Sequence, residues 1–375
     1  MKSNIIIGLR NTGNTMKIDL EKWEEYREKR LISSARHPSL PLTIWAYTSN
    51  CQYEQAWDEI TLSCRGLVTD DDGNIVAKPF PKFFNMEERR HQATDDYQVY
   101  EKLDGTLGIM FSYQGEWVFA TKKSFDSEYV DFFRAMMLKG LTSRGKRYSE
   151  VLKHLSTDCT YLFELIKPEF KIVVDYASKE ELVLIGSYHN ETCEETPPDI
   201  VLTALEQFIP VVKRYQALET ETLRYMKELN TENKEGFVVR FSNGQRCKIK
   251  FKQYIQLHAL ITGASNLSIW KMLRDGKNFD ADILSQIPDE LYEWMEEIKD
   301  SLQSEYAEII EKHREILEQI KQKEYPSRKE IAIEILRVAR EKDAKSWILF
   351  GLFENKVDQD RIWKLIRPAH ETYWG

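Results

Sequence analysis

The chain has 375 residues, of which 42% are hydrophobic and 12% aromatic, so its composition supports a sizeable folded core and excludes a disordered protein. Its 53 basic and 61 acidic residues give a net charge of −8, which argues against nucleic-acid binding through whole-molecule charge but not through a local basic groove. No apolar run approaches the ~20 residues of a membrane span, and the 5 cysteines form no CxxC pair, so we expect no membrane segment, zinc ribbon or disulfide scaffold, and a cytoplasmic location.

The first predicted element follows a short leading segment. Residues 1–15 contain one brief apolar stretch that is too short for a secretory signal, and Met16 offers a second start. We therefore expect residues 1–15 to be an N-terminal extension that the fold does not need. The spacing of apolar residues from Lys17 to Arg30 predicts an amphipathic helix.

Residues 42–255 are predicted to be rich in strands, with one helical stretch near 127–155. Runs of β-branched and aromatic residues alternate with glycine turns there. Both positions of a two-residue hairpin loop take positive φ, which Asn-Gly and Asp-Gly tolerate well. Three such loops are predicted, at Asp72-Gly73, Gln114-Gly115 and Asn243-Gly244. In the second hairpin, this loop places Lys122 opposite Leu107.

The third hairpin predicts a charged face and an apolar face. A two-residue loop there places Phe237 opposite Lys250 and Val239 opposite Lys248. Because residues two apart share a face of a strand, Glu235, Lys248 and Lys250 are expected to lie together. The opposite face is expected to hold Val238, Cys247, Ile249 and Phe251. A solvent-facing strand would explain the charges equally well, so a second charged cluster is needed to favour a site.

That second cluster is Tyr100 to Thr106, where Lys102 comes two residues before an Asp-Gly pair. Lysine is a poor nucleophile at its ordinary pKa of about 10.4. Neighbouring cations such as Lys122, Lys248 and Lys250 favour its neutral form, and they would also neutralise a triphosphate. The absence of a side chain at Gly105 lets a nucleotide approach the backbone.

The C-terminal third is predicted to be helical. Apolar residues recur at helical spacing from Asp289 to about Lys323, and Pro326 ends this helix. Ser327 and Glu330 form a capping-box pattern for a helix that runs to about residue 340, and shorter helices are expected near 344–353 and 358–366. Residues 321–345 hold eight Lys or Arg and five Asp or Glu. This local excess of basic residues suits RNA phosphates, although a solvated helix surface explains it as well.

Lys102-Leu-Asp-Gly-Thr106 resembles the KxDG(S/T) motif of ATP-dependent ligases and capping enzymes, and three further motifs follow in the order of that superfamily. They are Phe163-Glu164, Glu235-Gly236-Phe-Val-Val and Lys248-Ile-Lys250. Four further segments resemble the RNA ligase 1 family of T-even bacteriophages in particular: residues 63–68, 78–85, 163–174 and 248–258. This narrower resemblance covers roughly residues 40–260. Thr106 stands where that motif more often has serine, and Lys123 where we expect glycine.

The resemblance implies an α+β fold. It implies a nucleotidyltransferase (adenylyltransferase) domain of ATP-grasp-like antiparallel sheets over residues 16–258, followed by an all-helical RNA-specificity domain over residues 259–375. It further implies that Lys102 is the nucleophile that becomes adenylated and that Lys248 helps to activate it. Phosphate contacts are implied for Arg65, Lys82, Lys122 and Lys250. Nucleotide contacts are implied for Phe84 beside the adenine, Gly105, Tyr254 and Glu164, and metal binding for Glu164 and Glu235. Asp104 is expected to hold the loop rather than a metal.

The implied activity is ATP-dependent RNA ligation in three steps, with a lysyl-AMP and an RNA-adenylate as intermediates. Mg²⁺ is the expected metal, with Mn²⁺ as an alternative. The expected partners are RNA with 5′-phosphate and 3′-hydroxyl ends, such as a nicked tRNA anticodon loop, and a separate end-healing kinase-phosphatase. We expect a monomer in the cytoplasm, of the host if the chain is encoded by a phage.

Two alternatives remain open at this point. A DNA ligase or an mRNA-capping guanylyltransferase uses the same lysyl-nucleotide chemistry, but usually carries a small β-barrel after the last lysine motif. A non-catalytic RNA-binding protein on a decayed ligase core is the other alternative. Decay should remove the nucleophile or a motif lysine, yet Lys102, Lys248 and Lys250 are all present.

Overall fold

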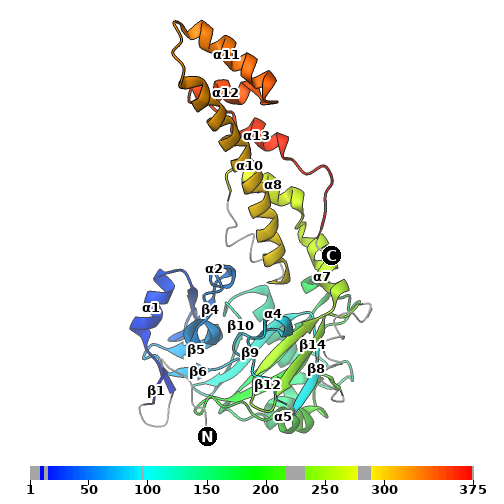
Figure 1. Ribbon diagram of the computed structural model, residues 1–375. Coiled ribbons are helices and arrows are strands. Elements are labelled where there is room, and N and C mark those ends of the chain that lie inside the picture. Colours follow the sequence, from blue (N-terminus) through cyan, green and yellow to red (C-terminus); the bar gives the residue numbers. More distant parts are fainter. Residues whose placement is uncertain (1–8, 12–15, 95, 216–232, 278–288, 374–375) are drawn as a thin grey trace. The chain divides into compact units, whose positions relative to one another are not determined.

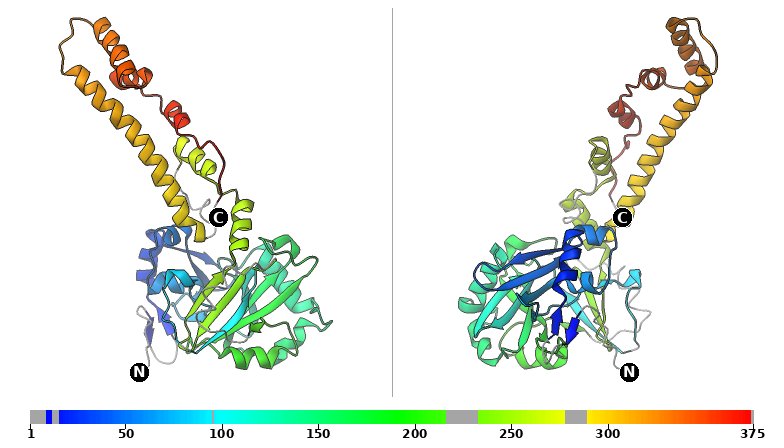
Figure 2. Two further views of the ribbon diagram at one scale, coloured as in Figure 1. Left: turned by 45° about the vertical axis from the view of Figure 1, so that its right-hand side comes forward. Right: turned by 90° about the vertical axis from the view of Figure 1, so that its left-hand side faces the viewer.

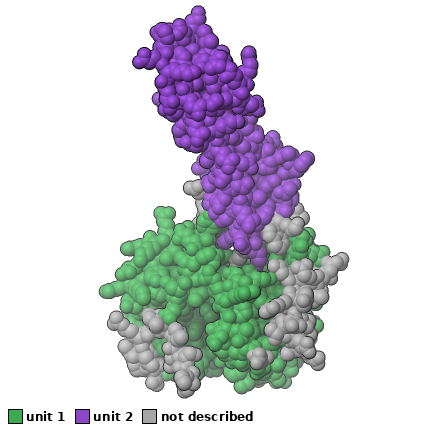
Figure 3. Space-filling view, in the orientation of Figure 1, with its two compact units in different colours: residues 1–258 green, residues 259–375 purple. Residues whose placement is uncertain are grey.

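The computed structural model of the protein describes residues 9–11, 16–94, 96–215, 233–277 and 289–373. The chain divides into two compact units, Met1–His258 and Ala259–Gly375 (Figure 1, Figure 3). The first unit contains all the described sheets, whereas the described part of the second contains helices and their connections. This confirms the predicted fold class. Among the described helices, none combines the length and the hydropathy of a membrane span.

Three larger sheets and a two-stranded one, β1–β2, are described in the first unit, and their strands pair antiparallel except for β15 with β7 (Figure 2). One sheet has the order β3 (Ile32–Arg36), β4 (Leu42–Tyr47), β5 (Arg65–Asp70), β6 (Ile75–Ala77). The second has the order β10 (Glu116–Thr121), β9 (Thr106–Tyr113), β11 (Cys159–Ile166), β12 (Glu181–His189). The third has the order β13 (Arg214–Tyr215), β8 (Tyr97–Lys102), β14 (Gly236–Phe241), β15 (Arg246–Lys250), β7 (Phe84–Asn85).

Helices connect and cover these sheets: α1 (Leu20–Glu28), α2 (Ser49–Tyr53), α3 (Glu59–Ser63), α4 (Glu128–Lys139) and α5 (Pro198–Leu205), with 3₁₀ turns at Met86–Glu88, Tyr148–His154 and Pro168–Phe170. The α4 helix starts at Ser127, whose side chain accepts a hydrogen bond from the Val130 amide. Its buried Phe133 contacts Phe119 of β10 and Phe163 of β11, at ring-centroid distances of 5.1 and 5.3 Å. This packing fixes β11, the strand that carries Glu164.

The N-terminal prediction holds only in part. Residues 1–8 and 12–15 of the expected extension lie outside the described residues, whereas β1 (Leu9–Asn11) pairs with β2 (Met16–Ile18). The first helix begins at Leu20 rather than at Lys17. The reason is local: the Asp19 side chain caps the helix by accepting a hydrogen bond from the Lys22 amide.

All three predicted hairpins form, but only one has the predicted two-residue loop. Gln114 and Gly115 both have positive φ, and Glu116 pairs with Tyr113 as expected. In the other two loops, Gly73 and Gly244 have positive φ and the residues before them do not. The Asp70 amide donates a hydrogen bond to the Asn74 carbonyl at 3.0 Å, and the Phe241 amide donates one to the Gln245 carbonyl at 2.9 Å. Each bond closes a three-residue loop.

The predicted register of the third hairpin is therefore wrong by one residue. The Asn243 side chain accepts a hydrogen bond from the Gln245 amide and donates one to the Gln92 carbonyl, which favours the three-residue loop. Val238, rather than Val239, pairs with Lys248. Val238 consequently shares the face of the lysines, and the apolar face holds Phe237, Val239, Cys247, Ile249 and Phe251.

The second unit is built from α8 (Asn266–Arg274), a 3₁₀ turn at Asp289–Leu291, α10 (Tyr292–Lys321), α11 (Arg328–Glu341), α12 (Ser346–Phe353) and α13 (Gln359–Leu365). The long predicted helix and the N-cap at Ser327 are confirmed. His313 on α10 bonds the Ile309 carbonyl through Nδ1, at 2.6 Å, and accepts the Lys345 amide at Nε2, at 2.9 Å. This neutral imidazole joins α10 to the start of α12. A further helix, α7 (Lys252–Thr262), crosses from the first unit into the second.

Candidate active site

Lys102 lies at the end of β8, where the third sheet brings two lysines beside one glycine. Gly236 of β14 pairs with Lys102 on one side and with Lys250 of β15 on the other. Two residues farther along the same face, Val238 pairs with Lys248, which is 8% exposed. The sheet therefore places Lys102, Lys248 and Lys250 on one face, as the sequence analysis expected, although by a different register.

Gly236 also brings Glu235 to Lys102. A Cβ atom at residue 236 would lie 1.9 Å from the Ile249 carbonyl oxygen, and φ is +154°, so only glycine fits. This conformation interrupts the regular alternation of side chains just before β14. As a result, Glu235 Oε1 lies 2.5 Å from Lys102 Nζ, and the Glu235 side chain is 5% exposed. The predicted proximity of these two residues therefore depends on the glycine rather than on strand parity.

Asp104 anchors the loop that follows Lys102. Its Oδ2 accepts hydrogen bonds from the amides of Val173 and Val174, both at 2.8 Å, and its Oδ1 accepts one from the Tyr254 hydroxyl at 2.8 Å. Its own amide donates to the Tyr176 hydroxyl at 2.9 Å. Both carboxylate oxygens are thus engaged by donors of the chain, which supports a role in holding the loop.

Glu164 meets the same loop from β11. Its Oε1 accepts a hydrogen bond from the Gly105 amide at 3.1 Å. A Cβ atom at residue 105 would lie 2.6 Å from the Leu165 carbonyl oxygen, so close packing against β11 already requires this glycine. Burial raises the pKa of Glu164 to about 7, and the nearby Glu235 adds to the increase while Lys102 opposes it. Two neighbouring carboxylates thus lie beside Lys102 and its loop.

The two carboxylates fit a hard divalent cation, because such ions prefer oxygen ligands and retain several waters. Glu235 contributes to the raised pKa of Glu164, and a cation bound by the pair would oppose that effect. In the described part of the chain, no group of three or more His, Cys, Asp or Glu side chains has a metal-binding arrangement. A cation held here would therefore take its remaining ligands from water or phosphate.

A second group of cations lies beyond Glu164. Arg65, at the start of β5, opposes the increase in the Glu164 pKa and is therefore close to it. Burial lowers the pKa of Lys122 to about 8, and Arg65 and Lys82 lower it further. The Lys122 Nζ lies 3.6 Å from the ring centroid of Tyr47. Positive groups from β5, the end of β10 and the segment before β7 thus converge.

Lys82 and Phe84 occupy the outer part of this cation group. Lys82 Nζ lies between three rings, 5.3 Å from the centroid of Tyr47, 5.1 Å from Trp57 and 5.4 Å from Phe84. Phe84 shares its row of the sheet with Cys247, so it belongs to the face opposite Lys248. A cavity of about 640 Å³ borders Lys82 and Phe84, and Lys102 is not among its lining residues.

The residues expected in the site fall into two groups. One contains Arg65, Lys82 and Lys122, with Phe84 on the sheet face opposite Lys248. The other surrounds Lys102 and contains Glu164, Glu235, Lys248 and Lys250. Tyr254 joins it through its hydrogen bond to Asp104, and Lys250 Nζ lies 5.8 Å from the Tyr254 ring. Sequence reasoning missed three residues: Tyr47, Trp57 and Tyr176. Nothing local in the sequence marks Tyr176, because its partner Asp104 lies 72 residues away.

The chain belongs to the RNA ligase family, whose sequence profile matches residues 63–255. A candidate bifunctional polynucleotide kinase/RNA ligase of Autographa californica nuclear polyhedrosis virus is 27% identical over 234 residues, covering 55% of this chain and 32% of that protein. A candidate RNA ligase of Thermovibrio ammonificans is 27% identical over 231 residues, covering 58% of each chain. An RNA ligase of Rhodothermus phage RM378 is 25% identical over 389 residues, covering 83% of this chain and 85% of that protein. The chain thus spans less than two thirds of the first two relatives.

Proposed function

We propose that the protein is an ATP-dependent RNA ligase that forms a covalent lysyl-AMP at Lys102. The observation that carries this proposal is the position of Lys102 Nζ, 2.5 Å from Glu235 Oε1 and on one sheet face with Lys248 and Lys250. In the first step, Nζ forms a bond to the α-phosphorus of ATP, the bond to the β-phosphate oxygen breaks, and pyrophosphate leaves with the electron pair. The attacking neutral amine releases one proton to solvent in the same step.

Charged side chains surround Lys102. Glu235 forms an ion pair with it, and Lys248 and Lys250 add positive charge on the same sheet face. A divalent cation bound by Glu164 and Glu235 would neutralise phosphate charge and draw the Glu235 carboxylate from the lysine. We propose Mg²⁺ in this position, with Mn²⁺ as a substitute.

The remaining two steps transfer the AMP to RNA. An RNA 5′-phosphate oxygen attacks the lysyl-AMP phosphorus, the P–N bond breaks, and the lysine recovers its proton. A 3′-hydroxyl then attacks the RNA 5′-phosphorus, gives up its proton, and AMP leaves. The cations Arg65, Lys122 and Lys250 suit this chemistry, because the charge on the transferred phosphate is stabilised by fixed donors.

We assign the two chemical tasks to the two parts of the chain. Residues 16–258 are proposed as the adenylyltransferase domain and residues 259–375 as the RNA-specificity domain. Of the eight cations between residues 321 and 345, several are held by carboxylates, in the pairs Lys321–Glu318, Lys323–Glu334, Arg328–Glu354 and Arg337–Glu341. Lys329 and Arg340 of α11 are exposed and have no ion-pair partner in the described part of the chain, so we propose these two for contacts to RNA phosphates.

The proposed substrate is RNA with a 5′-phosphate and a 3′-hydroxyl, such as a tRNA broken in its anticodon loop. The viral relative, by its name, joins a polynucleotide kinase to an RNA ligase. We propose that a separate kinase-phosphatase prepares the ends for this chain, and that the chain acts as a monomer in the cytoplasm. A DNA ligase or capping enzyme is disfavoured because residues 259–277 and 289–373 contain helices and no strand.

Incubation with α-labelled ATP and Mg²⁺ tests the proposed chemistry. Label should remain on the protein through denaturation, and Lys102→Ala should abolish it. Lys329→Ala is the matched control, because it removes a lysine of the other unit and should leave labelling unchanged. Retention of label from GTP instead of ATP would favour a capping enzyme, and unlabelled wild-type protein would refute the proposal. A nicked tRNA compared with a nicked DNA duplex then identifies the substrate class.

A further inference from the structure

The group of cations that begins at Arg65 contains hydrogen-bond donors that the protein itself does not use. The Arg65 Nη1 and the Trp57 Nε1 are both buried, and neither has a hydrogen-bond partner in the part of the chain that the structure describes. A buried donor without a partner costs free energy, so such groups are rare unless a ligand or water completes them. Both donors lie in the neighbourhood of Lys82 and Lys122.

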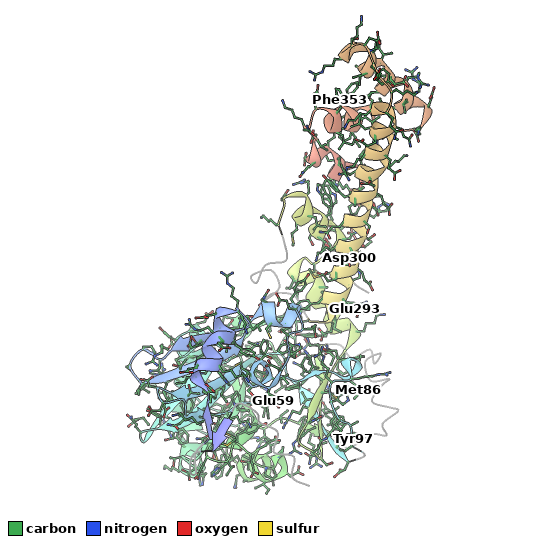
Figure 4. All side chains as sticks on the ribbon, turned by 60° about the vertical axis from the view of Figure 1, so that its left-hand side comes forward. Glu59, Met86, Tyr97, Glu293, Asp300 and Phe353 are labelled. Atoms are coloured by element: carbon green, nitrogen blue, oxygen red, sulfur yellow. The ribbon has the colours of Figure 1, made fainter. Side chains whose placement is uncertain are left out.

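Trp57 is held firmly within this group. Its ring makes edge-to-face contacts with Tyr47 and Phe84, at centroid distances of 5.1 and 5.3 Å. The same ring is one of the three that surround Lys82 Nζ. Trp57 precedes Asp58, whose carboxylate is engaged by the amides that open α3, where Glu59 is labelled in Figure 4. Contacts with neighbouring aromatic rings therefore fix the position of the indole, and its N–H group remains available to a ligand.

The chemistry of these groups specifies their ligand. Arginine, lysine and the indole N–H are donors only, and none of them can accept a hydrogen bond. A ligand that satisfies Arg65, Trp57 and Lys122 together must therefore present several acceptor oxygens and negative charge. A polyphosphate has both properties, whereas a base or a ribose presents donors and acceptors in mixture.

The position of these donors indicates which phosphates of ATP they would bind. The α-phosphorus must approach Lys102 Nζ, which lies beside Glu235. Trp57 contacts Lys82, and Tyr47 joins Lys82 to Lys122. The residues beside Lys102 are instead Glu235 and the loop glycine Gly105, which Glu164 bonds. The oxygens that Trp57 meets therefore belong to the phosphates farther from the reacting atom.

We propose that Trp57 binds the β,γ-phosphates of ATP, the portion that leaves as pyrophosphate, through its Nε1–H. It also keeps Lys82 in place through its ring. This proposal rests on the proposed ATP-dependent function and adds a residue that no motif of the sequence identified. It predicts that Trp57 distinguishes ATP from AMP, because AMP lacks the phosphates in question.

Calorimetric titration of Lys102→Ala protein with ATP and with AMP tests this prediction without any chemical step. Trp57→Phe keeps the ring and removes the N–H group, so it should weaken ATP binding roughly tenfold or more and leave AMP binding unchanged. Trp23→Phe is the matched control: the Trp23 Nε1 is also buried without a partner, but its ring contacts Trp45 rather than a lysine. It should change neither affinity. Equal weakening of both nucleotides by Trp57→Phe, or of neither, would overturn the proposal.

Kinetics of the otherwise unaltered enzyme give an independent readout. Trp57→Phe should raise the KM for ATP in self-adenylation and the KM for pyrophosphate in the reverse reaction. Sealing of chemically pre-adenylated RNA needs no triphosphate, so its rate should stay at the wild-type value. A parallel loss in sealing would show a general structural defect and refute the assignment. Absence of lysyl-AMP in the wild-type protein would instead refute the proposed function, and the calorimetry would still decide the role of Trp57.

Discussion

Two carboxylates near the proposed nucleophile differ in how they are held. Glu235 is fixed by its ion pair with Lys102, whereas Glu164 accepts a backbone hydrogen bond from Gly105. Burial and the proximity of Glu235 raise the pKa of Glu164 to about 7. Near neutral pH, Glu164 is therefore partly protonated, and a cation bound beside it would favour its charged form.

The raised pKa of Glu164 predicts that the folded protein becomes less stable as the pH rises. The ordinary pKa of 4.5 rises to about 7 in the folded protein, so the folded state holds a proton that the unfolded state has lost between these values. The free energy of unfolding should decrease from pH 4.5 to 7, with a contribution from this residue of up to about 3 kcal/mol. Urea denaturation in a chelator, compared between wild type and Glu164→Gln, measures it. The variant should be more stable above pH 7 and similar near pH 4.5.

The hairpin between β14 and β15 shows how one element sets the site. Two glycines of this hairpin have different structural roles. Gly236 allows the β14 backbone to approach the Ile249 carbonyl, and Gly244 takes the positive φ that the loop requires. The site depends on the first of these, since Glu235 reaches Lys102 only because the chain departs from regular strand geometry at residue 236.

Replacement of each glycine by alanine should separate these roles. Gly236→Ala forces a Cβ atom to 1.9 Å from a carbonyl oxygen, so we expect a loss of stability of more than about 3 kcal/mol, together with loss of adenylation. Gly244→Ala meets no atom within 4 Å and strains only its φ of +84°, so a loss of about 1 kcal/mol is expected. Urea denaturation of both variants makes the comparison, and equal losses would contradict it.

A second element-level prediction concerns His313 on α10. Burial lowers its pKa below 6.5, aided by Lys312 and Lys345 and opposed by the hydrogen bond to Ile309. The neutral ring accepts the Lys345 amide, so this contact is complete above pH 6.5 and is lost as pH falls and the ring gains a proton. Hydrogen exchange of the Lys345 amide, corrected for intrinsic rate, should accelerate below pH 6.5. His313→Gln should remove this pH dependence.

The sequence was sufficient to select the proposed nucleophile and its two glutamates and to predict the helical second unit, because each has a local signature. The KxDG motif located Lys102, and regular apolar spacing located α10. Register was harder to predict: Asn243-Gly244 is compatible with two loop lengths, and a hydrogen bond to Gln92 selects the longer one. Trp57 had no signature, because its partners Tyr47, Lys82 and Phe84 come from separate segments.

At the scale of the whole molecule, the boundary between the two units falls within α7. This helix begins two residues after Lys250, carries Tyr254 to Asp104, and continues to Thr262, past the boundary between the units at His258. A cut at the boundary would shorten the helix that supports the nucleophile loop, so a functional fragment of the first unit must include all of α7.

Removal of the second unit should separate the proposed steps. A fragment of residues 1–265 keeps every residue assigned to nucleotide binding, so it should form lysyl-AMP from ATP at close to the rate of the full chain. It should lose preference for nicked tRNA over a simple nicked RNA duplex, because the proposed RNA-specificity domain is absent. Labelling and sealing assays on both proteins test this. A fragment that retained the tRNA preference would contradict the assignment of residues 259–375.

The anchoring of Asp104 has a consequence for the newly synthesised protein. Its carboxylate and amide are held by Val173, Val174, Tyr176 and Tyr254, which follow it by 69 to 150 residues. A nascent chain that ends before residue 254 lacks one of these supports, even though Lys102 left the ribosome much earlier. The proposed reactivity toward ATP should therefore arise late in translation, and incomplete chains released from a stalled ribosome should not consume the nucleotide.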